Sequence, residues 1–475
     1  MTSMRLTAAW VAAQMGGTLA DGDPSREFGD VSIDSRTLNA GDLFIAIRGE
    51  QFNGALYAAP AIESGAAGVV VPRGWYRITD NRSASVSSEG EQSVVIEVDD
   101  TTVALQRLAY GIRRASGTRV VAITGSAGKT TTKEVTSEFL EIRYRVVRNQ
   151  GNFNNHIGLP LSLIELRQRP EIAVVELGMS RAGEVSTLVR VAEPEVRVWT
   201  NVGEAHLGFF ASLDEIADAK AEILEGAHAK TLLVANADDP LIVKRAASFR
   251  GRIVTFGIDR AADVRASHVV DRGIDGTSAR VTTPRGSVTI ATPLVGRANL
   301  SNILAAVAVA LEFDVPLADI ATKAGGLRPA PHRGEVVRLA SGVTVIDDSY
   351  NANPTATKRA LDVFAGTQAT RRIAVLGEML ELGAHATALH EDVGRAAAKA
   401  GVDLLLAVGG EPAAALAAAA VSAGMKAAKV RHFATSDEAA EAALAMVRPG
   451  DVVLVKGSRG VQTDRVVERL TSELG

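Results

Sequence analysis

A lysine and a threonine suited to binding phosphate occur in the segment VVAITGSAGKTTTKEV, residues 120–135. The apolar run 120–123 is typical of a strand, and residues 132–140 are typical of a helix. A glycine-containing turn between a strand and a helix directs backbone N–H groups toward an anion. We therefore expect Lys129 to bind the terminal phosphates of a nucleotide, and the Thr130 hydroxyl to bind a bridging Mg²⁺.

The loop in this segment is shorter than the usual phosphate-binding loop. The usual pattern has a glycine five residues before Gly128, but Ile123 occupies that position. The first available glycine is Gly125, which makes the loop two residues shorter and indicates a particular subset of nucleotide-binding proteins. The alternative interpretation is a Gly-Lys turn that binds no ligand.

Other polar residues follow strands that we expect downstream of this loop. Glu176 ends the apolar run 172–175, and His206 follows the strand expected at residues 196–200. Ligands of parallel sheets bind at the carboxyl ends of strands. We expect Glu176 to be a ligand of a second Mg²⁺, whereas His206 fits a structural role as well as a metal site.

Amide and lysine side chains elsewhere leave two interpretations open. GNFNNHIGLP, residues 151–160, has more amides than a connecting loop needs, although a hydrogen-bonded turn would also use them. Asn299 and Asn302 open an alanine-rich helix and could cap it or contact a purine. Lys220 follows a capping box at Ser212 and, taken alone, indicates a solvated lysine in helical charge pairs.

Length and composition limit the class of protein. The 475 residues are 47% hydrophobic and 22% charged, which is typical of globular chains and leads us to expect three domains. A net charge of −4 argues against a general binder of nucleic acid or anionic membranes. The absence of cysteine excludes disulfides, thiolate metal sites and a cysteine nucleophile. No apolar run reaches about 18 residues, so we expect no membrane span.

The first part of the chain predicts a small α/β domain that ends near residue 98. It combines a helix at 58–64 with strands at 43–47, 68–71 and 94–98. We expect residues 80–92, rich in serine and charge, to form a mobile loop. From composition alone, Asp34-Ser35-Arg36 favours turn chemistry and a surface ion pair over a binding role.

The remainder predicts two further α/β domains. Strands at 145–147, 172–176, 196–200 and 231–235 alternate with helices, which indicates a largely parallel sheet, and residues 256–294 indicate an antiparallel excursion. Beyond a Pro- and Gly-containing link, strands and helices alternate again as in a doubly wound domain, without a GxGxxG motif. Its strand ends carry GEMLELG (377–383) and KGSRG (456–460), which either close over a substrate or are ordinary loops.

Taken together, these motifs resemble the Mur ligases over nearly the whole chain. TGSAGKTTTK, GNFNNHIGLPL, VVELGM, NVGEAHL, the lysine in IADAKAEIL, NLSNILAA, DDSYNANP and LGEMLELG occur in the family order. DSYNANP and GEMLELG favour the member that adds D-alanyl-D-alanine to UDP-N-acetylmuramoyl-tripeptide over a sibling that adds another amino acid. The resemblance implies a UDP-sugar domain at 1–98, an ATP-binding domain at 99–327 and a Rossmann-like domain at 328–475.

The resemblance also implies the reaction and its setting. The tripeptide carboxylate would attack the γ-phosphate of ATP, and the dipeptide amine would displace the resulting acyl phosphate, with ATP and Mg²⁺ as cofactors. We expect a cytoplasmic monomer that contributes to peptidoglycan synthesis and binds no nucleic acid. The rival from another class is a nucleotide-dependent switch, which would hydrolyse ATP without the other substrates.

Roles for single residues come from the same resemblance. Lys220 matches a carbamylated lysine, in which a neutral amine has added carbon dioxide, and would bind the second Mg²⁺ with Glu176 and His206. The catalytic residues implied are Lys129, His206 and Lys220, and Thr130 completes the metal ligands. The implied ATP-binding residues are Thr124, Gly125, Ser126, Ala127, Gly128, Lys129, Thr130, Thr131, Asn299, Asn302, Arg333, Asp348, Tyr350 and Asn351. The implied substrate-binding residues are Asp34, Ser35, Arg36, Asn53, Asn154 and Asn155.

Two positions depart from the family pattern. Ala298 stands where siblings usually show histidine, and His332-Arg333 stands where Gly-Arg is expected.

Overall fold

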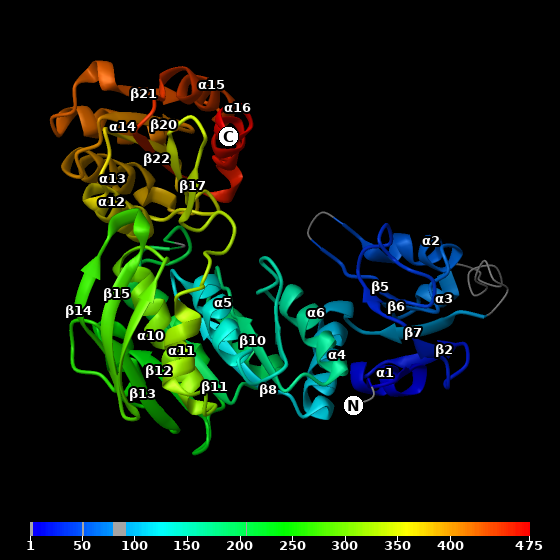
Figure 1. Ribbon diagram of the computed structural model, residues 1–475. Helices are drawn as coiled ribbons and strands as arrows, with labels where there is room; N and C mark the ends of the chain where they lie inside the picture. The colour runs from blue at the N-terminus through cyan, green and yellow to red at the C-terminus, as the bar shows by residue number, and fades with distance from the viewer. Residues whose placement is uncertain (1–2, 50–51, 79–91, 206) are drawn as a thin grey trace. The chain divides into compact units, whose positions relative to one another are not determined.

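A computed structural model describes residues 3–49, 52–78, 92–205 and 207–475 (Figure 1). The chain divides into two compact units. Unit 1 comprises Met1–Ala122, Tyr144–Met179 and Gly183–Glu195, and unit 2 comprises Ile123–Arg143, Ser180–Ala182 and Val196–Gly475. The predicted domain boundaries near residues 98 and 328 stay predictions. The expected mobile loop at 80–92 falls outside the described residues except for Gln92.

Unit 1 contains a five-stranded sheet in the order β2-β7-β6-β5-β4, parallel except where β2 joins β7. In addition, β1 pairs with β3, and β10 pairs in parallel with β9. The strands are β1 Leu6–Thr7, β2 Thr18–Asp21, β3 Glu27–Phe28, β4 Val31–Ser32, β5 Leu43–Ile45, β6 Gly68–Pro72, β7 Val94–Val98, β9 Val146–Arg148 and β10 Ile172–Glu176. The helices are α1 Ala8–Met15, α2 Ala58–Glu63, α3 Trp75–Ile78, α4 Thr101–Ser116, α6 Gly158–Ile164 and α7 Glu184–Ala192.

Unit 2 begins within β8, Arg119–Thr124, and its first part is a sheet with helices. Strands β11 to β14 run parallel, and β14, β15 and β16 form the antiparallel excursion that the sequence predicts. Helix α10 packs against α5 and against β12, β13 and β14 (Figure 1). The elements are α5 Lys129–Leu140, β11 Val196–Trp199, α8 Leu213–Ala221, β12 Leu232–Asn236, α9 Pro240–Ala246, β13 Arg252–Gly257, β14 Val264–Asp271, β15 Thr277–Thr283, β16 Gly286–Thr292, α10 Gly296–Glu312 and α11 Leu317–Ala324.

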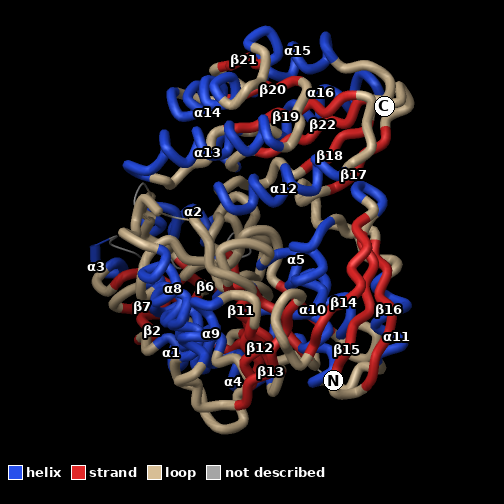
Figure 2. Tube along the Cα trace, turned by 90° about the vertical axis from the view of Figure 1, so that its left-hand side faces the viewer, coloured by secondary structure: helices blue, strands red, loops and turns tan. Residues whose placement is uncertain are grey.

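The second part of unit 2 is a doubly wound sheet in the order β17-β18-β22-β19-β20-β21, antiparallel only between β17 and β18. One face packs on α12, α13 and α14, and the other on α15 and α16 (Figure 2). The strands are β17 Glu335–Arg338, β18 Thr344–Asp347, β19 Arg371–Gly377, β20 Leu404–Val408, β21 Val430–Phe433 and β22 Asp451–Lys456. The helices are α12 Pro354–Gly366, α13 Ala386–Lys399, α14 Glu411–Ser422, α15 Ser436–Met446 and α16 Asp464–Leu474.

Most predicted elements are present, and the differences lie at their ends. Helix α5 begins at Lys129, three residues before the predicted start, because Gly128 adopts a left-handed conformation and serves as its N-cap. Ser212 caps α8 as predicted, but the α-helix stops at Ala221 and continues as a 3₁₀ turn, Glu222–Leu224. Among the described residues, none of the helices has the length and apolar character needed to cross a bilayer.

Candidate active site

The turn between β8 and α5 has the backbone geometry of a phosphate-binding loop. Gly125 has a φ of 152° and Gly128 a φ of 79°. A Cβ on Gly125 would lie 1.9 Å from Thr200 Oγ1, and a Cβ on Gly128 would lie 2.4 Å from Asn302 Oδ1. Both positions therefore require glycine on steric as well as conformational grounds.

Residues that follow β11 hold this loop in place. Ala127 N donates to Asn201 Oδ1 at 2.9 Å, and the Ala127 carbonyl accepts from Asn201 Nδ2 at 2.9 Å and from Thr200 Oγ1 at 2.8 Å. Ser126 Oγ donates to the Gly203 carbonyl at 3.0 Å and accepts from Gly203 N at 2.9 Å. The sequence reasoning did not single out Thr200 or Asn201, although an amide directly after a strand of a parallel sheet was a usable signal.

The start of α5 fits an anionic ligand. No side chain caps this helix. The first N–H groups of a helix have no acceptor within the helix, which is why helix N-termini suit anions. Lys129 is half-buried, and its Nζ donates to the Gly125 carbonyl at 2.8 Å, so its charge lies at the loop. Thr130 and Thr131 are half-buried in the same first turn. These features fit the phosphates of a nucleoside triphosphate, and they place Thr130 in the first turn of the helix, where the sequence predicts a magnesium ligand.

Lys220 is buried on α8, with 1% of its surface exposed. The interpretation of a solvated lysine from the sequence alone is wrong, because Lys220 shares the buried face of α8 with Ile216 and Ala217. Burial lowers the pKa of Lys220 well below its usual value, and the charge of Lys129 lowers it further. This shift favours the neutral amine, which is the form that can add carbon dioxide.

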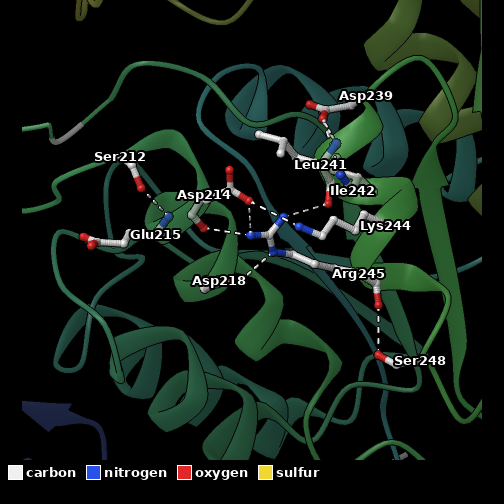
Figure 3. A network of polar contacts seen from close by, with 10 residues as sticks. All are labelled: Ser212, Asp214, Glu215, Asp218, Asp239, Leu241, Ile242, Lys244, Arg245 and Ser248. Carbon is white, nitrogen blue, oxygen red and sulfur yellow. Dashed lines mark hydrogen bonds and ion pairs between the residues drawn. The ribbon is translucent and has the colours of Figure 1, made fainter.

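A buried arginine attaches α8 to the following helix. Arg245 on α9 donates through Nε to Asp218 at 2.7 Å and through Nη2 to Asp214 at 3.0 Å (Figure 3). Its Nη1 donates to the Leu241 carbonyl at 3.2 Å, and only 11% of the side chain is exposed. These bonds fix the orientation of the helix that carries Lys220.

We expect Arg245→Met to lower the free energy of unfolding by about 1–2 kcal/mol, because a largely buried guanidinium loses charge-assisted hydrogen bonds. Urea unfolding followed by circular dichroism measures this change. Arg297→Met is the control, since the Arg297–Asp259 ion pair is exposed and should contribute less than about 0.5 kcal/mol. Equal effects of the two substitutions would contradict the argument.

In unit 1, Glu176 lies at the carboxyl end of β10, with 2% of its surface exposed. Its Oε1 accepts from Asn154 Nδ2 at 3.1 Å, and its backbone N–H donates to Asn149 Oδ1 at 3.1 Å. Asn155 uses its side chain as a cap for the Ile157 and Gly158 amides, which is the turn role left open by the sequence. The Asn154 side chain thus donates a hydrogen bond to Glu176, the predicted metal ligand.

The predicted metal ligands stay predictions. His206 lies outside the described residues. Among the residues that the structure does describe, no group of three or more His, Cys, Asp or Glu side chains could hold a metal ion. Two of the four predicted ligands, Thr130 and carbamylated Lys220, are not His, Cys, Asp or Glu, so such a group would not include them.

Asn302 and Asn299 lie at the start of α10. No side chain caps this helix, so the capping interpretation of the two asparagines is wrong. Asn299 Nδ2 donates to the Val295 carbonyl at 2.9 Å, and Asn302 Nδ2 donates to Asn299 Oδ1 at 3.4 Å. Asn302 packs against Gly128, which brings an amide to the phosphate loop.

The residues of the third domain that the sequence predicts to contact the nucleotide form an ion pair, a hydrogen bond and a cation–π contact within that domain. Asp348 forms an ion pair with Lys456 at 2.6 Å, and Lys456 Nζ donates to the Asn351 carbonyl at 3.1 Å. The Arg333 guanidinium lies 4.1 Å from the centre of the Tyr350 ring. Lys456 begins KGSRG, so that motif supplies a partner for Asp348 that the sequence did not predict.

In unit 1, the Asp34-Ser35-Arg36 turn contains the predicted surface ion pair. Arg36 Nη2 lies 2.6 Å from Asp34 Oδ2, and 85% of the arginine side chain is exposed. Hydrogen bonds from Arg36 lower the pKa of Asp34 to about 2. Asn53 Oδ1 accepts from Ala55 N at 3.3 Å. Binding of uridine by these residues stays a prediction.

Comparison with known proteins identifies the family. Family models match residues 27–113 (Mur ligase family, catalytic domain), 123–310 (Mur ligase middle domain) and 332–459 (Mur ligase, glutamate ligase domain). This chain belongs to the Mur ligase family. The resemblance drawn from the motifs is therefore confirmed, and so is the α/β fold class.

Relatives of this Mur ligase match it from end to end. A UDP-N-acetylmuramoyl-tripeptide–D-alanyl-D-alanine ligase from Bacillus subtilis is 34% identical and covers 98% of both chains. The crystal structure of MurF from Acinetobacter baumannii has a TM-score of 0.88 at 29% identity and covers 100% of both chains. A MurF ligase from Thermotoga maritima in complex with ADP has a TM-score of 0.79 at 28% identity, over 94% of this chain and 97% of that one.

Proposed function

We propose that this Mur ligase joins D-alanyl-D-alanine to UDP-N-acetylmuramoyl-tripeptide, consuming ATP and releasing ADP and phosphate. The observation that supports this most is the match, over nearly the full length of both chains, to a relative named for this reaction. The ADP complex of a structural relative supports the use of ATP. The product would be the UDP-linked pentapeptide precursor of peptidoglycan.

The phosphate loop and Lys129 would bind ATP. The glycine turn and the N-terminus of α5 would direct N–H groups at the phosphates. Lys129 would add a positive charge, whose stabilising effect increases as negative charge develops during transfer of the γ-phosphate. Asn302, which touches the loop at Gly128, would contact the adenosine portion. Mg²⁺ ions held by Thr130, Glu176, His206 and Lys220 would neutralise phosphate charge during transfer.

The substrate carboxylate would attack the γ-phosphate, and the resulting acyl phosphate would react with the amine of the dipeptide. Asp348, Tyr350, Asn351 and Arg333 would contact the nucleotide from the third domain. Closure of that domain would exclude water from the acyl phosphate. The substrate residues Asp34, Ser35, Arg36 and Asn53 would bind the uridine end. We further propose that the protein is a cytoplasmic monomer. Its three domains would meet near residues 98 and 328.

Phosphate release with single substrates omitted tests this function. We expect release only when ATP, the UDP-tripeptide and D-alanyl-D-alanine are all present, because the acyl phosphate needs the dipeptide amine to turn over. Mass spectrometry of the product should show the pentapeptide. Release from ATP alone would instead indicate a nucleotide switch, and turnover with a single amino acid in place of the dipeptide would indicate a sibling ligase.

A further inference from the structure

The GEMLELG segment after β19 is fixed by hydrogen bonds at three consecutive residues. Glu378 O accepts from Ser458 N at 3.1 Å, and Glu378 Oε2 accepts from Gly410 N at 2.8 Å. Met379 N donates to His390 Nε2 at 2.9 Å. Leu380 N donates to Ser458 Oγ at 2.9 Å. These bonds hold the loop to the segment that follows β22, to α13 and to the start of α14.

His390 lies on α13 and is completely buried. Its Nδ1 donates to the Ala386 carbonyl at 2.7 Å while its Nε2 accepts from Met379 N, so one ring nitrogen carries the proton and the other a lone pair. Burial lowers the pKa of His390 below its ordinary 6.5, although the Ala386 carbonyl and the charge of Glu378 oppose this shift. The ring is therefore neutral at pH 7, as the acceptor role requires.

The other side of this loop contacts the loop that follows β11. Glu381 O accepts from Gly208 N at 2.8 Å, and Leu207 packs against the hydrophobic cluster that contains Met379 and Leu382. Glu381 has a φ of 65°, which is unusual for a residue other than glycine and shows that its surroundings enforce the loop conformation. Residues 207 and 208 follow His206 directly in the sequence.

We propose that His390 is a positioning residue for the ligase reaction, because its ring holds the 378–383 loop and this loop in turn holds residues 207 and 208, which directly follow the predicted metal ligand in the sequence. His390 itself touches no reacting group. This inference rests on the proposed function. It predicts that the acceptor at Nε2, rather than the volume of the side chain, is what the reaction requires.

Three variants of the full chain separate the effect of the acceptor at Nε2 from the effects of side-chain volume and core packing. His390→Leu fills the site with an apolar side chain of similar size and removes the acceptor, whereas His390→Gln places an amide oxygen the same number of bonds from Cα as Nε2. Val393→Ala is the control for loss of core packing, because Val393 lies on the same helix as His390 and in the hydrophobic cluster that contains Met379. The measurements are kcat for phosphate release with all three substrates, thermal unfolding, and hydrogen exchange of the Met379 and Leu380 amides.

We expect His390→Leu to lower kcat by at least about tenfold and to accelerate exchange of the two amides, because a displaced loop misplaces the groups it contacts. His390→Gln should retain kcat within about threefold, and Val393→Ala should lower the thermal midpoint without either effect. A loss of kcat in His390→Leu no larger than in Val393→Ala, or a His390→Gln variant as impaired as His390→Leu, overturns the proposal. An inactive parent chain would instead overturn the proposed function. An active parent chain with either of the variant results above overturns only the role of His390.

Discussion

Replacement of Lys129 by alanine is expected to reduce substrate-dependent phosphate release by at least about 10³-fold, because the phosphate loop loses the cation that stabilises charge during transfer. The fold should survive. Lys129 is half-buried and makes a hydrogen bond to its own loop, so the cost in free energy of unfolding should stay near about 1 kcal/mol. Phosphate release and thermal unfolding, measured on the same preparation, check the two parts.

The control for this prediction is Lys230→Ala, which removes an exposed lysine from the same unit. It should leave phosphate release unchanged. Normal turnover by the Lys129→Ala variant would rule out the assignment of the phosphate loop, whereas an unfolded variant would show that Lys129 has a structural role that its geometry does not predict.

Replacement of Lys220 by alanine is expected to remove activity, and short carboxylates such as formate or acetate should restore part of it. Lys220 is buried with 1% exposure, and burial lowers its pKa well below the usual value, which favours the neutral amine that can form a carbamate anion. Alanine removes this anion and leaves a cavity on the buried face of α8. A small carboxylate can enter the cavity and supply the lost charge.

Two comparisons make the result specific to a carbamate. Sodium chloride at the same ionic strength should give no rescue, and Lys220→Arg should stay inactive because a guanidinium cannot add carbon dioxide. Labelled bicarbonate should give the unsubstituted chain a ¹³C carbamate signal that Lys220→Ala lacks. Activity of the arginine variant together with failed rescue would show that Lys220 acts as a cation.

Local patterns in the sequence identified the elements that build the candidate site. The β8–α5 turn was predictable because an apolar run, a glycine turn and a helix follow one another directly in residues 119–140, and each is set by contacts close in the chain. The cap at Ser212 was predictable for the same reason.

Burial and long-range partners were not predictable in this way. Lys220 has the sequence surroundings of an exposed helical lysine, and only the packing of α8 decides that it is buried. Asn201 reaches Ala127 across 74 residues, and Lys456 reaches Asp348 across 108. No periodicity within a helix or strand contains information on contacts at such separations.

The sequence by itself determined the chemistry that this Mur ligase can offer: the loop residues 124–131, Glu176 at a strand end and Lys220 on a helix. The tertiary structure decided which of these side chains are buried and which hydrogen bonds orient them. The physical reason is that residue type and spacing set local backbone conformation, whereas desolvation of Lys220, the steric fit of Gly128 on Asn302 and the fixed loop at His390 depend on residues brought together only by folding.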